Sequence, residues 1–165
     1  MPRFFITVLR AGIAAAILFG LFGQLVIIPT TAADEVDGFP PYAPYALPYT
    51  VVALAGVACV QAVLAAAWRL LTMVERDAIF SAAAFRWVDT IIGTTIAATL
   101  LAFAVTCHLM LADIPSPGDG MELISAFAAA TATTGIGACL VMLLVIMRGL
   151  LRKATHMKSE LAEVV

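Results

Sequence analysis

The sequence predicts an all-α integral membrane protein, a four-helix bundle of membrane spans joined by short antiparallel connections. Three observations lead to this class: of 165 residues 63% are hydrophobic, only 12% are charged, and the mean hydropathy is +1.05. A chain of this size cannot bury so much apolar surface in one soluble core. The composition therefore excludes a soluble globular domain, a disordered chain and a nucleic-acid binder with a basic face. It makes the lipid bilayer the first expected partner.

Four apolar stretches are each long enough to cross a hydrocarbon core of about 30 Å at 1.5 Å per residue. We expect spans at about 8–28, 49–73, 84–112 and 121–150, with a cytoplasmic helical tail at 151–165. Together they form one domain, 1–165. The triplet Thr31-Ala32-Ala33 leaves a cleaved signal peptide as an alternative for the first span, although its apolar stretch is longer than a usual signal sequence.

The few charged residues sort by side when the chain is threaded through four spans. All nine Lys and Arg residues fall on one side, whereas the loops 29–49 and 112–122 carry six acidic residues and no basic one. Cytoplasmic loops carry an excess of Lys and Arg. We therefore expect a plasma-membrane protein with both termini in the cytoplasm.

The connections are read from their turn-forming residues. Five of the eight prolines lie in 29–49, so we expect this loop to be extended rather than helical, with Pro48 in the first turn of the second helix. The turn formers of 112–120 predict a hairpin between the third and fourth spans. Ser81 is placed to cap a third helix that starts near Ala82.

Two further patterns concern packing. Small residues crowd 125–138, and small residues let membrane helices approach closely. We expect this face to be an internal seam, with a seam between subunits of a homo-oligomer as the alternative. The tail is read as a frayed cytoplasmic helix or, alternatively, as a docking stripe formed by apolar residues at helical spacing: Met157, Leu161, Val164 and Val165.

Counting residues from the span ends places four polar side chains at one depth, near the midplane: Gln61, Thr99, Thr133 and Thr134. A buried amide needs hydrogen-bonding partners, and threonine hydroxyls can supply them. We read this candidate midplane polar layer as a set of bonds between helices. The alternative is a polar substrate site, to which no charged group contributes.

Catalytic and metal-binding patterns are not found in the sequence. His108 has no second histidine at its depth, so we read it as a hydrogen-bonding residue near the outer boundary rather than as a haem or zinc ligand. Cys59, Cys107 and Cys139 form no Cys-x-x-Cys motif, and we read them as small apolar packing residues. We expect no catalytic residue, no metal and no cofactor.

One stretch, Trp68 to Gly93, resembles a family of small bacterial four-span membrane proteins, the domain of unknown function 2975, and especially its actinobacterial branch. The resemblance lies in Phe80-Ser81 at the inner turn, followed by Phe85, Arg86, Asp89 and Gly93. It implies a fold and a location but no chemistry. Some members occur beside small helix-turn-helix regulators, which implies signalling or regulation.

The residues of this core also have a purely physical interpretation. Phe80 can wedge between helix ends, Ser81 can cap a helix, and Arg86 and Asp89 are spaced to pair across one helical turn. We expect Phe80, Ser81, Arg86 and Asp89 to form a candidate interaction site.

The expected function is that of a non-enzymatic membrane protein that acts through a protein partner at the cytoplasmic face. Nucleic acid is not an expected partner. The alternative is a small oligomeric transporter or channel with the midplane polar layer lining its path. The absence of charged residues inside the spans counts against ion-coupled transport, which usually needs one.

Overall fold

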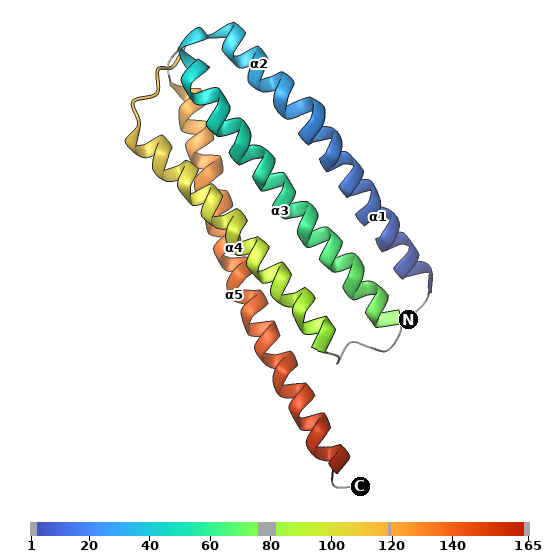
Figure 1. Cartoon of the computed structure of the whole chain (residues 1–165). Coiled ribbons are helices and arrows are strands. Elements are labelled where there is room, and N and C mark those ends of the chain that lie inside the picture. Colours follow the sequence, from blue (N-terminus) through green and yellow to red (C-terminus); the bar gives the residue numbers. More distant parts are fainter. Residues whose placement is uncertain (1–2, 76–81, 119, 164–165) are drawn as a thin grey trace.

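The computed structural model describes residues 3–75, 82–118 and 120–163, which form four long helical rods (Figure 1). The first rod joins α1 (Arg3–Phe22), a π-helical turn (Gly23–Ile27) and α2 (Ile28–Gly38). The second is α3 (Ala43–Glu75), preceded by a 3-10 turn (Pro40–Tyr42). The others are α4 (Ala82–Leu111) and α5 (Met121–Glu163). All four rods are long and apolar enough to span a membrane, and the described residues contain no strand. The predicted all-α membrane class is confirmed.

The prediction of an extended loop over 29–49 is wrong, because most of this segment is helical. Pro29 stands in the first turn of α2, directly after the π-helical turn in which the N–H of Ile28 bonds the carbonyl of Gly23. Pro40 begins the 3-10 turn and Pro44 lies in the first turn of α3. Pro40 and Pro44 stand at helix starts, where proline is tolerated because the N–H groups have no helical partner to lose. Pro29, in contrast, lies inside the continuous first rod, because Ile27 and Ile28 before it are already helical.

Pro48 does not lie in the first turn of the second helix, as predicted, but inside α3. The helix begins earlier, at Ala43, so one backbone bond near the start of the span is forgone. The chain reverses direction at Phe39, whose extended backbone lies between Gly38 and Pro40 and whose N–H bonds the carbonyl of Glu35. The first connection is therefore a tight helical hairpin.

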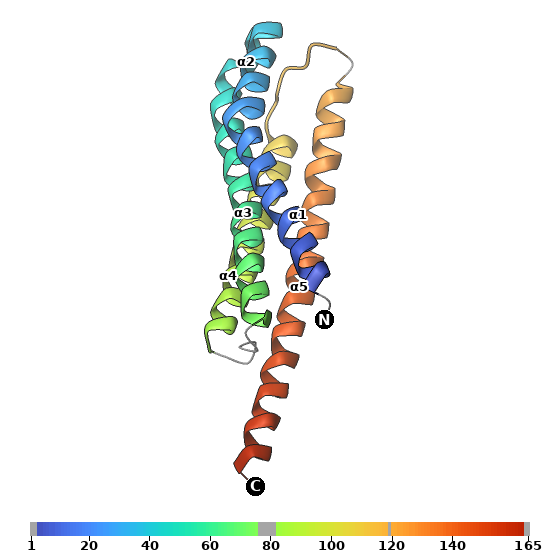
Figure 2. The same cartoon turned by 90° about the vertical axis from the view of Figure 1, so that its right-hand side faces the viewer.

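Each rod packs mainly on its neighbour in the chain (Figures 1 and 2). α1 and α2 pack on α3, α3 packs on α4, and α4 packs on α5, whereas the described residues of α1 and α5 make at most a slight contact. Only four apolar side chains are buried among the described residues: Ile13, Ala66, Ala84 and Ile92. Such extensive apolar exposure fits contact with lipid, because acyl chains solvate these side chains as well as a protein core does.

Close packing between rods depends on glycine at two points. A Cβ added to Gly137 of α5 would overlap the hydroxyl of Thr99 on α4 and lie 3.1 Å from that residue's Cβ. A Cβ added to Gly20 of α1 would lie 2.9 Å from Nε2 of Gln61 on α3. Gly137 belongs to the small-residue segment of 125–138, and at this point the segment faces another helix of the same chain.

We predict that Gly137→Ala destabilises the protein, because the short side chain of Thr99 cannot move away and α4 must separate from α5. Overpacking of this kind costs about 1–3 kcal/mol, or a fall in melting temperature of several degrees. Gly135→Ala is the matched control, since nothing lies within 4 Å of a Cβ added there. Circular dichroism melts of both variants in one detergent make the comparison, and equal melting temperatures would contradict the packing described.

Candidate functional site at the basic end

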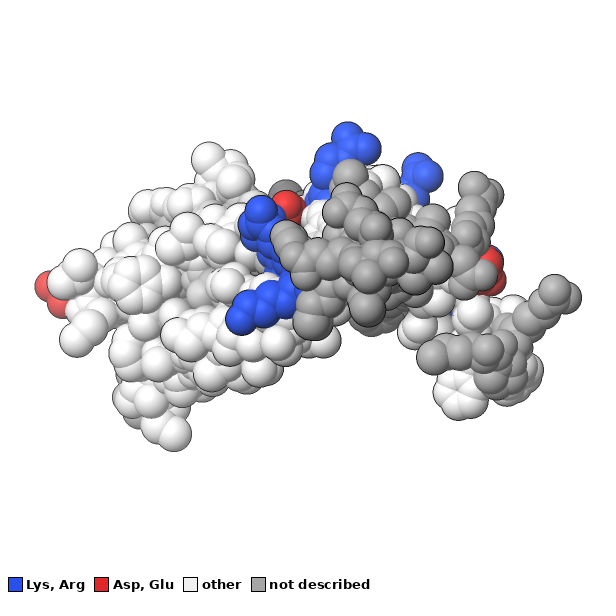
Figure 3. All heavy atoms as spheres, turned by 90° about the horizontal axis from the view of Figure 1, so that it is seen from below, with Lys and Arg blue, Asp and Glu red and all other residues white. Residues whose placement is uncertain are grey.

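The charged side chains divide between the two ends of the bundle. One end of the bundle, which we call the basic end, holds most of the described basic side chains together with two acidic ones. These residues are Arg10, Arg69, Arg86, Arg148, Arg152 and Lys153, with Glu75 and Asp89. The acidic end holds Asp34, Glu35, Asp37, Asp113 and Glu122. Figure 3 looks at the basic end and shows the blue basic side chains gathered there. This end contains the described part of the predicted interaction site.

Asp89 of α4 pairs with Arg148 of α5. Nη2 of Arg148 donates to Oδ2 of Asp89 at 2.9 Å, and Nε contacts the other carboxylate oxygen. One hydrogen bond and one ion-pair contact therefore join the two side chains. The predicted pairing of Asp89 with Arg86 is wrong. The physical reason is that the Asp89–Arg148 pair joins two helices that pack along their length, whereas Arg86 is exposed and makes no ion pair among the described residues.

Phe80 and Ser81 lie outside the described residues, so their predicted roles at the inner turn stay predictions.

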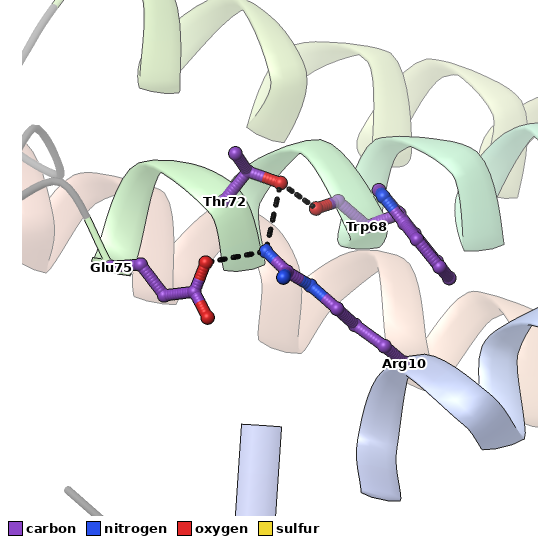
Figure 4. Close-up of polar contacts among 4 residues, drawn as sticks. All are labelled: Arg10, Trp68, Thr72 and Glu75. Atoms are coloured by element: carbon purple, nitrogen blue, oxygen red, sulfur yellow. Dashed lines mark hydrogen bonds and ion pairs between the residues drawn. The ribbon is translucent and has the colours of Figure 1, made fainter. Parts of the chain in front are cut away.

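A second cluster, which no pattern in the sequence indicates, centres on Arg10 of α1 (Figure 4). Its Nη2 donates to Oε2 of Glu75 at 2.6 Å and to Oγ1 of Thr72 at 3.2 Å, both on α3. Its guanidinium also lies 5.8 Å from the centre of the Trp68 ring. One arginine thus holds three side chains on successive turns of α3, through an ion pair, a hydrogen bond and a cation–π contact.

A third contact joins α3 to α4, where the guanidinium of Arg69 lies 5.8 Å from the centre of the Trp87 ring. Three arginine contacts at the basic end therefore link the four rods in chain order. Arg10 of α1 contacts α3, Arg69 of α3 contacts α4, and Arg148 of α5 contacts α4. We call this set the arginine row. Nothing local in the sequence indicates the arginine partners of Trp68 and Trp87.

The structure does not bring the residues of the candidate midplane polar layer together by hydrogen bonds. Thr99, Thr133 and Thr134 each donate to the carbonyl four residues earlier in their own helix. Gln61 faces Gly20 instead, and its Nε2 is buried with no hydrogen-bonding partner among the described residues. Thr99 does contact the helix of Thr133 and Thr134, through its packing against Gly137.

At the acidic end, polar side chains tie α3 to the rods on either side of it. Nε2 of Gln24, within the π-helical turn, donates to the carbonyl of Leu54 on α3 at 3.1 Å. The hydroxyl of Tyr49 on α3 lies 2.9 Å from Nδ1 of His108 on α4. The ring of Tyr45 also lies edge-on to His108. Among the described residues no group of His, Cys, Asp and Glu is arranged to hold a metal ion, and the three cysteines form no disulfide.

The bundle and its charge distribution define a small polytopic membrane protein. The profile of one family, described as protein of unknown function (DUF2975), matches residues 30–165. The chain belongs to this family, which confirms the resemblance drawn from the stretch around Arg86 and Asp89. No curated protein and no solved structure matches the chain.

We predict that Asp89→Ala weakens the α4–α5 contact. Both side chains are partly exposed, so the loss is limited to about 1 kcal/mol, or about 2–4 °C in melting temperature. The charge-swapped variant Asp89→Arg with Arg148→Asp restores an opposite pair and should recover at least half of the loss. Arg86→Ala is the control and should melt like the unmodified chain. A swap no more stable than Asp89→Ala would show that the pair contributes nothing.

Proposed function

We propose that the chain is a non-enzymatic protein of the plasma membrane, with its basic end in the cytoplasm, that acts there through a protein partner. The observation that carries this proposal is the length of α5. It has 43 residues against 30 for α4, which is about 65 Å of helix at 1.5 Å per residue. A hydrocarbon core of about 30 Å takes up less than half of it.

The excess length of α5 projects beyond the other rods at the basic end (Figures 1 and 2). Arg152 and Lys153 are exposed where this projection begins, and Arg86 is exposed on the neighbouring α4. Asp89 and Arg148, in contrast, are occupied with each other. The contact surface we propose is therefore narrower than the sequence indicated: Arg86 of α4 together with Arg152 and Lys153 of α5. Its charge favours a partner with an acidic segment.

The orientation is supported by the charge division between the ends, since Lys and Arg accumulate on the cytoplasmic side of membrane proteins. We expect two single-cysteine variants, Lys153→Cys and Asp37→Cys, to report opposite sides when each is made in a chain whose three native cysteines are replaced by alanine. In intact cells a membrane-impermeant maleimide should modify only the Asp37→Cys variant, and after permeabilisation it should modify both. If only the Lys153→Cys variant were labelled in intact cells, the basic end would lie outside the cell, and this result would refute the proposal.

The partner is tested by placing a photo-crosslinking amino acid at Lys153 in cells that make the protein naturally. We expect one discrete protein adduct, which disappears when Arg86→Glu and Arg152→Glu are added because both new charges repel an acidic segment. Asp113→Lys, a charge reversal at the opposite end, is the control and should leave the adduct unchanged. Adducts of lipid mass only, or a protein adduct that survives the reversals, would refute the proposed surface.

A further inference from the structure

A pocket of about 730 Å³ opens at the acidic end, bounded by α2, α3, the end of α4 with its following loop, and the start of α5. Most of its lining is apolar, including Ile28, Ala53 and Leu123. Figure 2 shows α2 and α5 standing apart at this end of the bundle. Its volume lies within the ~300–1,000 Å³ of small-molecule sites, which combine apolar walls with a few placed polar groups.

The charged groups in the lining are of one sign. Glu35 of α2 and Glu122 of α5 both line the pocket, and no Lys or Arg does. The sequence has no basic residue between Arg10 and Arg69, nor between Arg86 and Arg148, so no Lys or Arg side chain at this end neutralises the two carboxylates. The one histidine at this end, His108, is engaged with Tyr49.

Three tyrosines, Tyr42, Tyr45 and Tyr49, supply aromatic surface to the same pocket, and all three are half-buried. Their rings are held by neighbours. Tyr49 is bonded to His108, Tyr45 lies edge-on to the same imidazole, and Tyr42 lies edge-on to Phe39 with ring centres 4.9 Å apart. Aromatic faces attract cations, and rings that are already fixed lose little freedom when a ligand binds.

From these three observations we propose that the pocket binds a hydrophobic monovalent organic cation, such as a quaternary ammonium or phosphonium compound. The carboxylates of Glu35 and Glu122 provide the counter-charge, the tyrosine rings contact the cation, and the apolar walls receive its hydrocarbon groups. This site lies at the end opposite to the proposed partner surface and does not depend on it.

The structure of α2 supports the assignment. The π-helical turn Gly23–Ile27 ends at the pocket, since Ile27 and Ile28 both belong to its lining. Turns of this kind occur frequently at functional sites. Here the turn directly precedes the helix that carries Glu35, and Gln24 anchors it to α3 by its bond to the carbonyl of Leu54.

The first test compares two ions of the same shape and opposite charge, tetraphenylphosphonium and tetraphenylborate. Equilibrium dialysis is done with the full chain in dodecyl maltoside, an uncharged detergent, and detergent without protein sets the background. We expect saturable binding of the phosphonium and none of the borate. Equal binding of both ions, or no saturable binding of the phosphonium, would overturn the proposal without any variant having to fold.

The second test removes the carboxylates. Glu35→Gln with Glu122→Gln should weaken phosphonium binding about tenfold or more. Asp37→Asn with Asp113→Asn removes the same charge from the same end at residues outside the lining, and it should change the affinity less than twofold. Equal weakening in both double variants would overturn the proposal, because it would assign the attraction to the general charge of this end. Tyr42→Leu keeps an apolar wall and should weaken binding about three- to thirtyfold.

A zwitterionic membrane lipid whose headgroup ends in an ammonium group shares this chemistry with a free organic cation. Short-chain phosphatidylethanolamine, with short-chain phosphatidylglycerol as its control, distinguishes the two sources in the same dialysis. Displacement of the phosphonium by the ethanolamine lipid alone would support the site with a lipid headgroup as its occupant. Absence of displacement by either lipid would support it with a free cation. Equal displacement by both lipids would overturn the proposal, because the pocket would then select acyl chains.

Discussion

The arginine row joins all four rods at the basic end of the bundle. Lipid removes most of the hydrophobic driving force between helices, so packing and a few polar contacts must set their neighbours. Only four apolar side chains are buried among the described residues. Arg10, Arg69 and Arg148 each join two rods at the same end. At the acidic end Gln24 and Tyr49 tie α3 to the rods on either side of it, and the helices there also border a pocket.

The two ends of the molecule carry different side chains. At the basic end, Asp89 and Arg148 pair with each other although both remain partly exposed. Arg86, Arg152 and Lys153 are exposed there as well. At the acidic end, carboxylates and tyrosine rings surround space rather than each other. The proposed partner surface and the proposed cation pocket lie at opposite ends of the bundle.

Composition and charge were enough to predict four spans, because lipid imposes length and apolarity on every spanning helix. The contacts within the candidate site were not predictable in the same way. Residue counting gave the depths of Gln61 and Thr99 but not the rotation of their helices, which turned Gln61 toward Gly20. Arg86 was the nearest cation in sequence to Asp89, whereas the actual partner, Arg148, lies 59 residues away. The prolines of 29–49 predict a break in the helices, but two of them, Pro40 and Pro44, stand at helix starts, where proline is tolerated. Pro29 and Pro48, in contrast, lie inside helical rods.

The π-helical turn between α1 and α2 has a consequence for how the two ends are aligned. Such a turn accommodates one residue more than an α-helical turn, and one residue corresponds to about 100° of rotation about the helix axis. Gly23–Ile27 therefore sets the angle, measured about the axis of the first rod, between the face that carries Arg10 and the face that carries Glu35. Without the extra residue, the first rod would still cross the membrane and Arg10 would still contact Glu75. At the acidic end, however, α2 would turn a different face toward the pocket.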